Sequence, residues 1–228
     1  MMKPLLSIIV PVFDEDRIIN DLIEHLHGLP SGNGCEVIIV DGNQSQNTLK
    51  AIFRGDVKKI ASFKGRGAQM NAGAAVAKGK ILLFLHADTL LPPPALDQIL
   101  LALKQPDIVG GAFDLGINSN RWGFRLIETV ASLRSRITRI PYGDQAIFIK
   151  KTVFERLGGF GEIPLMEDVD LMQRVKKTGQ KIAIIPLKVL TSPRRWEKEG
   201  LLFSTLKNWI LISLYLLGVS PQRLAKFY

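Results

Sequence analysis

Short apolar runs alternate with segments of helical periodicity through the first half of the chain, and this alternation constrains the fold more than any other feature. The runs predict buried strands over residues 5–12, 36–40, 58–62 and 81–85. Helices are predicted over 18–29, through 49–52, over 66–77 and from the prolines at 92–94 to 103. This order of elements is typical of βαβ units with right-handed crossovers. We therefore expect an α/β fold with a mostly parallel central sheet and flanking helices.

Two of these helices carry more specific predictions. Asp14 or Asp16 is expected to cap the helix over 18–29, since a carboxylate accepts hydrogen bonds from the first N–H groups of a helix. The helix over 66–77 consists largely of small residues, so it can approach a strand or a ligand closely.

The pattern changes after about residue 108. Further strands are predicted over 109–117, 146–149 and 182–186, and helices over 120–139 and 167–178. A helical wheel of 120–139 separates an apolar face from an arginine face. The apolar face contains Trp122, Leu126, Val130, Leu133 and Ile137, and the arginine face contains Arg121, Arg125, Arg136 and Arg139.

Residues 201–217 are apolar almost all round, with Lys207 and Asn208 near the centre. Such a pair at the middle of a bilayer costs on the order of several kcal/mol. We expect a helix that packs on its own domain, on a second subunit or on a membrane surface, and not a helix that spans a bilayer.

The charge of the chain is unevenly distributed. Residues 1–114 carry 11 basic and 12 acidic side chains, whereas residues 115–228 carry 19 and 9. A basic second half indicates either an anionic partner or an ordinary solvated face. The apolar residues near the start lie between prolines and acids, which fits a strand better than a signal peptide and favours a cytoplasmic location.

Acidic and polar residues follow several predicted strands, where ligands bind in α/β folds. Asp14 and Asp41 follow the first two strands and could accept hydrogen bonds from a nucleoside. His86 and Asp88 follow the fourth strand, and one carboxylate with substrate phosphates can hold Mg²⁺ or Mn²⁺. Taken singly, these residues also have structural explanations, such as a helix cap for Asp14 and a turn for Asp41.

Two more stretches combine residue types that suit phosphate binding and proton transfer. Glycines around Arg66 let the backbone approach a ligand, and the arginine fork suits a phosphate. Glu167 and Asp168 open the helix over 167–178, where acids are common caps. Alternatively, Asp168 is a general base that removes a proton from a hydroxyl group.

In this order, the stretches resemble the family 2 glycosyltransferases, which have the GT-A fold, over roughly residues 5–196. Residues 7–15 resemble the opening strand and nucleotide loop, and Val40-Asp41-Gly42 resembles the second nucleotide-binding acid. His86-Ala87-Asp88 stands where the family has Asp-x-Asp, so histidine replaces the first acid. Glu167-Asp168 is similar to the family's Glu-Asp pair, whose aspartate acts as the base. Residues 192–196, ending in Arg194-Arg195-Trp196, are similar to Gln-x-x-Arg-Trp, with serine in place of glutamine.

The stretches 142–146 and 217–221 are also similar to a compact bacterial subgroup of that family, sometimes associated with arsenosugar biosynthesis. The resemblance implies a domain over 1–196, with a nucleotide-binding half (1–107) and an acceptor half (108–196). It leaves residues 197–228 as a C-terminal helical appendage.

The resemblance implies an inverting transfer from a nucleoside diphosphate sugar, with a UDP-sugar favoured, to an acceptor hydroxyl. Asp168 would be the base, with Glu167 beside it, and Asp88 would hold Mg²⁺ or Mn²⁺. The residues implied to bind the donor are Pro11, Phe13, Asp14, Asp41, Arg66, Asn71, His86, Ala87 and Asp88. The residues implied to contact the acceptor or the diphosphate are Asp144, Gln145, Arg194, Arg195 and Trp196.

The acceptor is unspecified and could be lipid-linked or a small molecule. Contact with the inner face of a membrane and a homodimer are both compatible with the sequence, and no nucleic acid is expected. Two alternatives remain: a nucleotidyltransferase, which the acids at 14–16 disfavour, and a basic module that binds membrane surfaces or nucleic acid.

Overall fold

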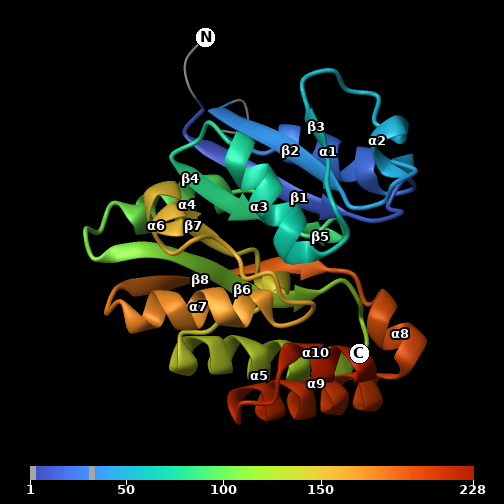
Figure 1. Cartoon of the computed structure of the whole chain (residues 1–228), viewed down its shortest axis with the longest axis vertical. Helices are drawn as coiled ribbons and strands as arrows, with labels where there is room; N and C mark the ends of the chain where they lie inside the picture. Colours follow the sequence, from blue (N-terminus) through green and yellow to red (C-terminus); the bar gives the residue numbers. More distant parts are fainter. Residues whose placement is uncertain (1–3, 31–33) are drawn as a thin grey trace.

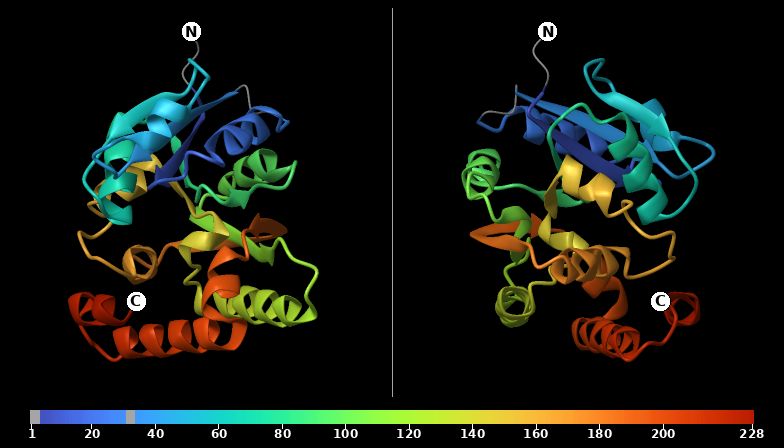
Figure 2. Two further views of the ribbon diagram at one scale, coloured as in Figure 1. Left: turned by 90° about the vertical axis from the view of Figure 1, so that its right-hand side faces the viewer. Right: turned by 60° about the vertical axis from the view of Figure 1, so that its left-hand side comes forward.

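The computed structural model describes residues 4–30 and 34–228. Its centre is an eight-stranded sheet of order β3-β2-β1-β4-β7-β6-β8-β5, with helices on both faces (Figures 1 and 2). The strands are β1 (Leu6–Val12), β2 (Cys35–Asp41), β3 (Lys58–Ala61), β4 (Ile81–Phe84), β5 (Thr89–Leu90), β6 (Ile108–Ile117), β7 (Phe148–Lys150) and β8 (Lys181–Thr191).

The helices follow the predicted alternation and add several short ones near the C-terminal end. They are α1 (Ile19–His27), α2 (Asn47–Ala51), α3 (Arg66–Val76), α4 (Ala95–Leu103), α5 (Trp122–Thr138), α6 (Lys151–Arg156), α7 (Glu167–Lys177), α8 (Arg194–Glu199), α9 (Leu201–Leu216) and α10 (Pro221–Leu224). Short 3₁₀ helices cover η2 (Gly143–Gln145) and η3 (Ala225–Phe227).

The prediction of an α/β fold around a large sheet is confirmed. The sheet is parallel from β3 through β4, as the βαβ pattern predicts. Its second half is mixed, because the short strand β7 runs antiparallel to both β4 and β6. The remaining pairs are parallel between β6 and β8 and antiparallel between β5 and β8.

The two faces of β1 belong to two separate hydrophobic clusters, because successive side chains of a strand point to opposite sides. Ile8 and Val10 pack with α1 and α4 on one face. Ile9 packs with α3, α6 and α7 on the other face. The sheet is therefore buried on both sides, which explains why its strands read as continuous apolar runs.

The prediction that the helix of small residues approaches a strand closely is confirmed for α3. A Cβ atom at Gly73 would lie 2.5 Å from Cγ2 of Ile9 and 3.0 Å from Cγ2 of Val40. A larger residue at this position would therefore push α3 away from β1 and β2.

The prediction that Asp14 or Asp16 caps the first helix is wrong. The residue before α1 is Ile18, and no side chain caps the helix there. The N–H groups of Ile18 and Ile19 instead donate to the carbonyl oxygen of Glu15. Asp14 has a φ of 55° and accepts a hydrogen bond from Asn43, so the turn directs its carboxylate toward the end of β2.

The arginine face of α5 contacts the sheet through some of its side chains. Arg136 pairs with Asp114 at 2.6 Å, and Arg139 donates to the carbonyl oxygen of Ile182. Arg121, Arg125 and Arg139 nevertheless remain exposed, and the apolar face, from Trp122 to Ile137, is exposed as well.

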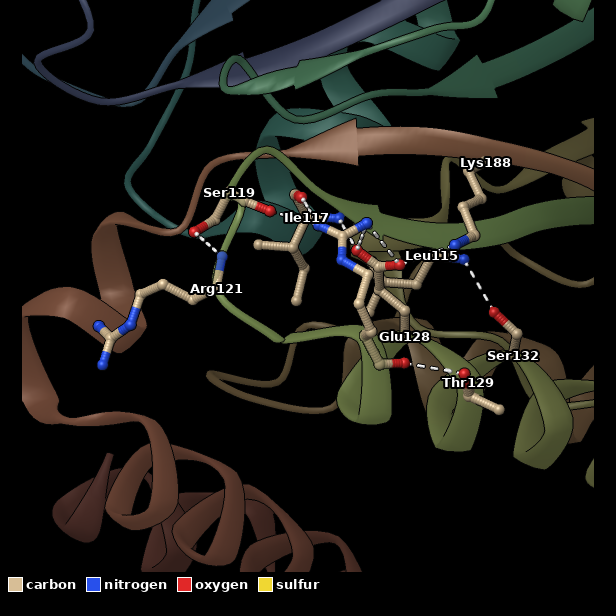
Figure 3. Close-up of polar contacts among 9 residues, drawn as sticks. Leu115, Ile117, Ser119, Arg121, Glu128, Thr129, Ser132 and Lys188 are labelled. Carbon is tan, nitrogen blue, oxygen red and sulfur yellow. Dashed lines mark hydrogen bonds and ion pairs between the residues drawn. The ribbon is translucent and has the colours of Figure 1, made fainter. Parts of the chain in front are cut away.

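The second part of β6 explains the orientation of α5 (Figure 3). β6 pairs with β7 only at Gly110 and Gly111, so beyond Gly111 the side that faces away from β8 is a free edge. The N–H groups of Leu115 and Ile117 donate to Ser132 at 3.1 Å and to Glu128 at 2.8 Å, both on α5. Glu128 is buried and also accepts from Lys188 at 2.7 Å. A strand edge needs hydrogen-bond partners, so α5 places its polar side against β6.

The C-terminal helices pack beneath the loop that precedes α7. Leu165 contacts Leu211 of α9 and Leu224 of α10 in a small buried cluster. Among the described residues, no helix is both long enough and apolar enough to cross a membrane.

Candidate active site

A cavity of about 280 Å³ lies where the loop after β4, η2, the start of α7 and the C-terminal helices meet. It gathers eight of the predicted site residues from segments far apart in the sequence. They are Arg66, His86, Asp88, Asp144, Glu167, Asp168, Arg195 and Trp196. The other predicted residues, which do not line this cavity, are Pro11, Phe13, Asp14, Asp41, Asn71, Ala87, Gln145 and Arg194.

Asp168 lies in the first turn of α7, with its carboxylate held against η2. Its Oδ2 atom accepts a hydrogen bond from the N–H of Gly143 at 2.5 Å. A Cβ atom at Gly143 would lie 3.1 Å from Nε2 of His86 and 3.4 Å from Oδ2 of Asp168. The absence of a side chain at Gly143 therefore lets this turn fit between the two groups.

Burial changes the proton affinity of the groups around Asp168. It raises the pKa of Asp144 to about 6, although Arg134 opposes the increase. Burial also raises the pKa of Glu167, and the neighbouring charge of Asp168 adds to that effect. Burial and the nearby Arg66 lower the pKa of His86, so its ring is neutral at pH 7.

Three arginines lie among these acids. Arg66, at the start of α3, interacts with the charges of Glu167 and Asp168. Arg195 donates to the Tyr228 hydroxyl at 2.5 Å and to Oδ1 of Asn208 at 2.8 Å.

Arg194 pairs with Asp88 at 3.2 Å and with Glu15 at 3.2 Å, joining α8 to the loops after β4 and β1. Together with Arg66 and Arg195, it supplies positive charge suited to phosphate.

A second group of predicted residues lies at the ends of β1 and β2. Asp41 is fully buried, and its Oδ1 atom accepts from the backbone N–H of Asn43 at 2.8 Å. The side-chain amide of Asn43 donates to Asp14 at 2.5 Å. The exposed ring of Phe13 lies 4.8 Å from Nζ of Lys64. The structure thus brings Phe13, Asp14 and Asp41 together, outside the cavity that contains Asp88 and Asp168.

Asn71 and Gln145 make structural contacts. The side chain of Asn71 donates to the carbonyl oxygen of Phe160 and accepts from the N–H of Phe160, each at 2.9 Å. Gln145 is fully buried and donates to the carbonyl oxygen of Phe113 at 2.9 Å. Their predicted contacts with substrate remain predictions.

The chemistry of the donor set near Asp88 allows a metal site that is completed by substrate. Among the described residues, no group of three or more His, Cys, Asp or Glu side chains is arranged to enclose a metal ion. Mg²⁺ commonly uses one or two carboxylates together with substrate phosphates and water. Asp88 therefore fits such an ion as its single carboxylate ligand, provided that a diphosphate supplies further oxygens.

Several lining residues were missed by the sequence analysis. Asn208, Ile212 and Tyr228 reach the cavity from the C-terminal appendage. Arg134, on α5, lies behind the lining: it stacks 3.1 Å above the ring of Tyr142 and interacts with the charges of Asp144 and Asp168. No local motif marks these residues, because only the packing of α5 and α9 brings them to the site.

A larger cavity of about 650 Å³ lies at the opposite end of β6 and β8. Two of its basic residues are paired with acids: Lys181 with Asp107 at 2.9 Å, and Arg136 with Asp114 at 2.6 Å. The other two, Arg139 and Lys176, donate to backbone carbonyl oxygens. The smaller cavity, with its acids, arginines and neutral histidine, is the better candidate for chemistry.

Comparison with known proteins gives a family match over residues 7–160, to the family described as glycosyl transferase family 2. The probable glycosyltransferase YdaM of Bacillus subtilis is 23% identical over 90% of this chain and 53% of its own length. An undecaprenyl-phosphate 4-deoxy-4-formamido-L-arabinose transferase of Pseudomonas paraeruginosa is 23% identical over 68% of this chain and 51% of its own length. The chain thus spans about half the length of these curated relatives.

Among solved structures, the chain is similar to the mannosyltransferase PcManGT from Pyrobaculum calidifontis in complex with GDP-Man and Mn²⁺. The two share 20% identity and a TM-score of 0.63, over 83% of this chain and 57% of the other. This likeness supports the fold, and the identity is too low to carry over substrates.

Proposed function

Because the chain belongs to glycosyl transferase family 2, is a glycosyltransferase and has the GT-A fold, we propose that it transfers a sugar from a nucleoside diphosphate sugar to an acceptor hydroxyl with inversion. The observation that carries this proposal is that Asp168 shares one cavity with His86 and Asp88. The side chains of Arg66, Arg195 and Tyr228 line the same cavity. A free carboxylate beside a site for a diphosphate is what this reaction requires.

Asp168 is proposed as the general base. It removes the proton of the acceptor hydroxyl while the acceptor oxygen attacks the anomeric carbon and the bond to the diphosphate breaks. The N–H of Gly143 fixes one carboxylate oxygen, which orients the carboxylate. Glu167 lies beside it, more deeply buried, and its raised pKa favours a neutral supporting role near pH 7.

The donor is proposed to lie between the two clusters of predicted residues. Phe13, Asp14 and Asp41 would hold the nucleoside, with Pro11 shaping the end of β1. Arg66 would contact the diphosphate, and neutral His86 would hydrogen-bond it or the ribose. Uridine is the nucleoside we favour, and a complex of a structural neighbour with GDP-Man supports the nucleotide-sugar class more broadly.

Asp88 would hold a divalent cation, Mg²⁺ or Mn²⁺, which supplies positive charge opposite the leaving diphosphate. Support comes from the position of the Asp88 carboxylate in the cavity and from the Mn²⁺ in the neighbouring structure. Arg194 now pairs with Asp88, so it would have to release that carboxylate when the donor binds.

The acceptor is proposed to enter from the side of η2, α8 and α9. Asp144, Arg195 and Trp196 line this side, and Gln145 fixes η2 from beneath. The name of the Pseudomonas relative, an undecaprenyl-phosphate transferase, supports a lipid-linked acceptor. The division into a nucleotide-binding half (1–107), an acceptor half (108–196) and an appendage (197–228) is part of this proposal.

Replacement of Asp168 by Asn tests the base. Asp168→Asn should lower kcat at least 100-fold, since general bases contribute about 10²–10⁴-fold, while nucleotide-sugar affinity changes little. Asp170→Asn is the matched control, because Asp170 also lies in the first turn of α7 but pairs with Arg174 at 2.7 Å, outside the cavity.

Both variants should be assayed for release of nucleoside diphosphate from candidate donors. Unchanged turnover in Asp168→Asn would remove this residue from the mechanism. Release of pyrophosphate in place of nucleoside diphosphate would favour the alternative of nucleotidyl transfer.

A further inference from the structure

The outer faces of α5 and α9 expose many large apolar side chains. On each helix these side chains lie opposite the residues that pack on the protein, such as Phe124 of α5 and Leu211 of α9. Those at least half exposed are Trp122, Leu126, Leu133, Ile137, Leu202, Phe203, Leu206, Trp209, Ile210, Leu216 and Leu217. Single exposed apolar residues are ordinary, but a contiguous set of this size marks an interaction surface.

The two helices form one surface, which we call the α5/α9 face. They meet at their first turns, where a Cβ atom at Gly123 would lie 3.3 Å from Leu201. Both helices lie at the end of the molecule farthest from α1 and β2 (Figures 1 and 2). The residues exposed on both helices can therefore reach one partner together.

Basic side chains border the α5/α9 face near the ends of its helices. Arg121, Lys198, Arg223 and Lys226 are exposed on or beside these helices. Glu128, the one acid of α5, is buried beneath the helix. Glu199 is held by Lys207 at 2.8 Å, which leaves Glu197 as the exposed acid of residues 194–228.

We propose that the α5/α9 face docks on the surface of an anionic phospholipid bilayer, with both helices lying in the interfacial plane. Apolar and tryptophan side chains would enter the boundary between headgroups and acyl chains, and the surrounding cations would meet the lipid phosphates.

A second copy of the chain fits this face less well than a bilayer does. A two-fold symmetric dimer places the same patch of each copy against the other. The basic rims of the two copies would then face each other, which opposes association. An anionic surface complements both the apolar centre and the basic rim.

Docking in this orientation would place the cavity close to the lipid headgroups. Asn208 and Ile212, on the inner side of α9, line the cavity, while Leu206 and Ile210 point outward. One helix thus separates the candidate acceptor site from the docking face. This inference rests on the proposed function only where it assigns the acceptor to the membrane.

Flotation with lipid vesicles tests the docking. The full chain should bind vesicles that contain phosphatidylglycerol, bind pure phosphatidylcholine vesicles weakly, and dissociate as salt is raised. The double variant Leu206→Ser/Ile210→Ser should bind at least about tenfold more weakly, because two apolar side chains no longer enter the interface. Arg223→Gln/Lys226→Gln should reduce binding and its dependence on salt.

The double variant Phe53→Ser/Phe63→Ser is the matched control, since both side chains are 88% exposed but lie in the nucleotide half. It should bind vesicles like the wild type. Thermal melting of each variant checks that the fold is retained. Equal vesicle binding by the Leu206/Ile210 variant and the wild type would overturn the proposal.

Sedimentation without lipid identifies the competing partner. A dimer that the Leu206/Ile210 variant abolishes, together with no vesicle binding by the wild type, would make this face an interface between copies.

The docking test uses no sugar donor, so its outcome does not depend on the proposed function. Asp168→Asn should bind vesicles normally, and loss of transfer with normal docking would affect only the mechanism.

Discussion

Asp144 shows how one buried carboxyl group links the site to stability. It lines the cavity beside Asp168, and burial raises its pKa to about 6 despite the nearby Arg134. Arg134 is itself buried enough that its pKa is lowered to about 10. The fold therefore keeps a poorly solvated acid–arginine pair next to the proposed base, an arrangement typical of functional sites and not of stable cores.

Asp144→Asn should stabilise the protein at neutral pH. The folded pKa of Asp144, about 6, is above its ordinary value of 3.8, so the folded chain holds a proton that the unfolded chain releases between these values. The free energy of unfolding of the wild type should therefore fall as pH rises through this window. Asparagine does not titrate, so the variant does not lose stability in this way. Its free energy of unfolding should exceed that of the wild type by an amount that grows to about 1–3 kcal/mol between pH 4 and pH 8.

Urea unfolding of both proteins across this pH range measures the difference. Parallel curves for wild type and variant would show that Asp144 does not titrate with a raised pKa. Asp21→Asn, an exposed change on α1, serves as the control and should follow the wild type.

At the scale of the element, α5 acts as a polar cover for the free edge of β6. Its inward side supplies Ser132 and Glu128 to backbone N–H groups of the strand. The same strand pairs with β8, which ends at Thr191 beside the cavity. The hydrogen bonds of α5 thus support the strands from which part of the site extends, and they leave its apolar side facing outward.

Glu128→Ala should destabilise the fold by about 1–3 kcal/mol, because the N–H of Ile117 would lose its buried acceptor. Glu128→Gln retains an acceptor oxygen and should lose less stability. Ser132→Ala, which removes the acceptor of the Leu115 N–H at 3.1 Å, is a neighbouring comparison. Chemical denaturation gives the three values, and equal losses for the Ala and Gln variants would contradict the role of Glu128 as an edge acceptor.

At the scale of the whole molecule, one arginine joins distant parts of the chain. Arg194 of α8 pairs with Glu15 after β1 and with Asp88 after β4. The proposed donor would occupy the region that these pairs connect. Binding of a nucleotide sugar is therefore expected to stabilise the folded molecule and to compete with Arg194 for Asp88.

A thermal-shift assay tests this expectation. A nucleotide sugar with Mn²⁺ should raise the Tm of the wild type, since a ligand that binds only the folded state stabilises it. In Asp88→Ala, the part of the increase that depends on Mn²⁺ should disappear, while Asp21→Ala should respond like the wild type. Donor-induced shifts that are the same with Mn²⁺ and with EDTA in the wild type would exclude the metal role of Asp88.

Local pattern was sufficient for much of the fold. The β-branched runs predicted β1 through β4 because buried strands need apolar side chains on both faces. The small residues of α3 predicted its close approach to β1. Glu167 and Asp168 were predicted at the start of a helix, and α7 begins at Glu167.

Tertiary structure decided which way those elements face and which residues meet. The wheel of α5 separated two faces correctly, but only the unpaired edge of β6 determined that the polar face turns inward. Likewise, Tyr228 and Asn208 reach Arg195 only because α9 and its following turn fold back beneath α7. Sequence periodicity records which side chains share a face, whereas the partner of that face is set by the hydrogen-bonding needs and the shape of distant segments.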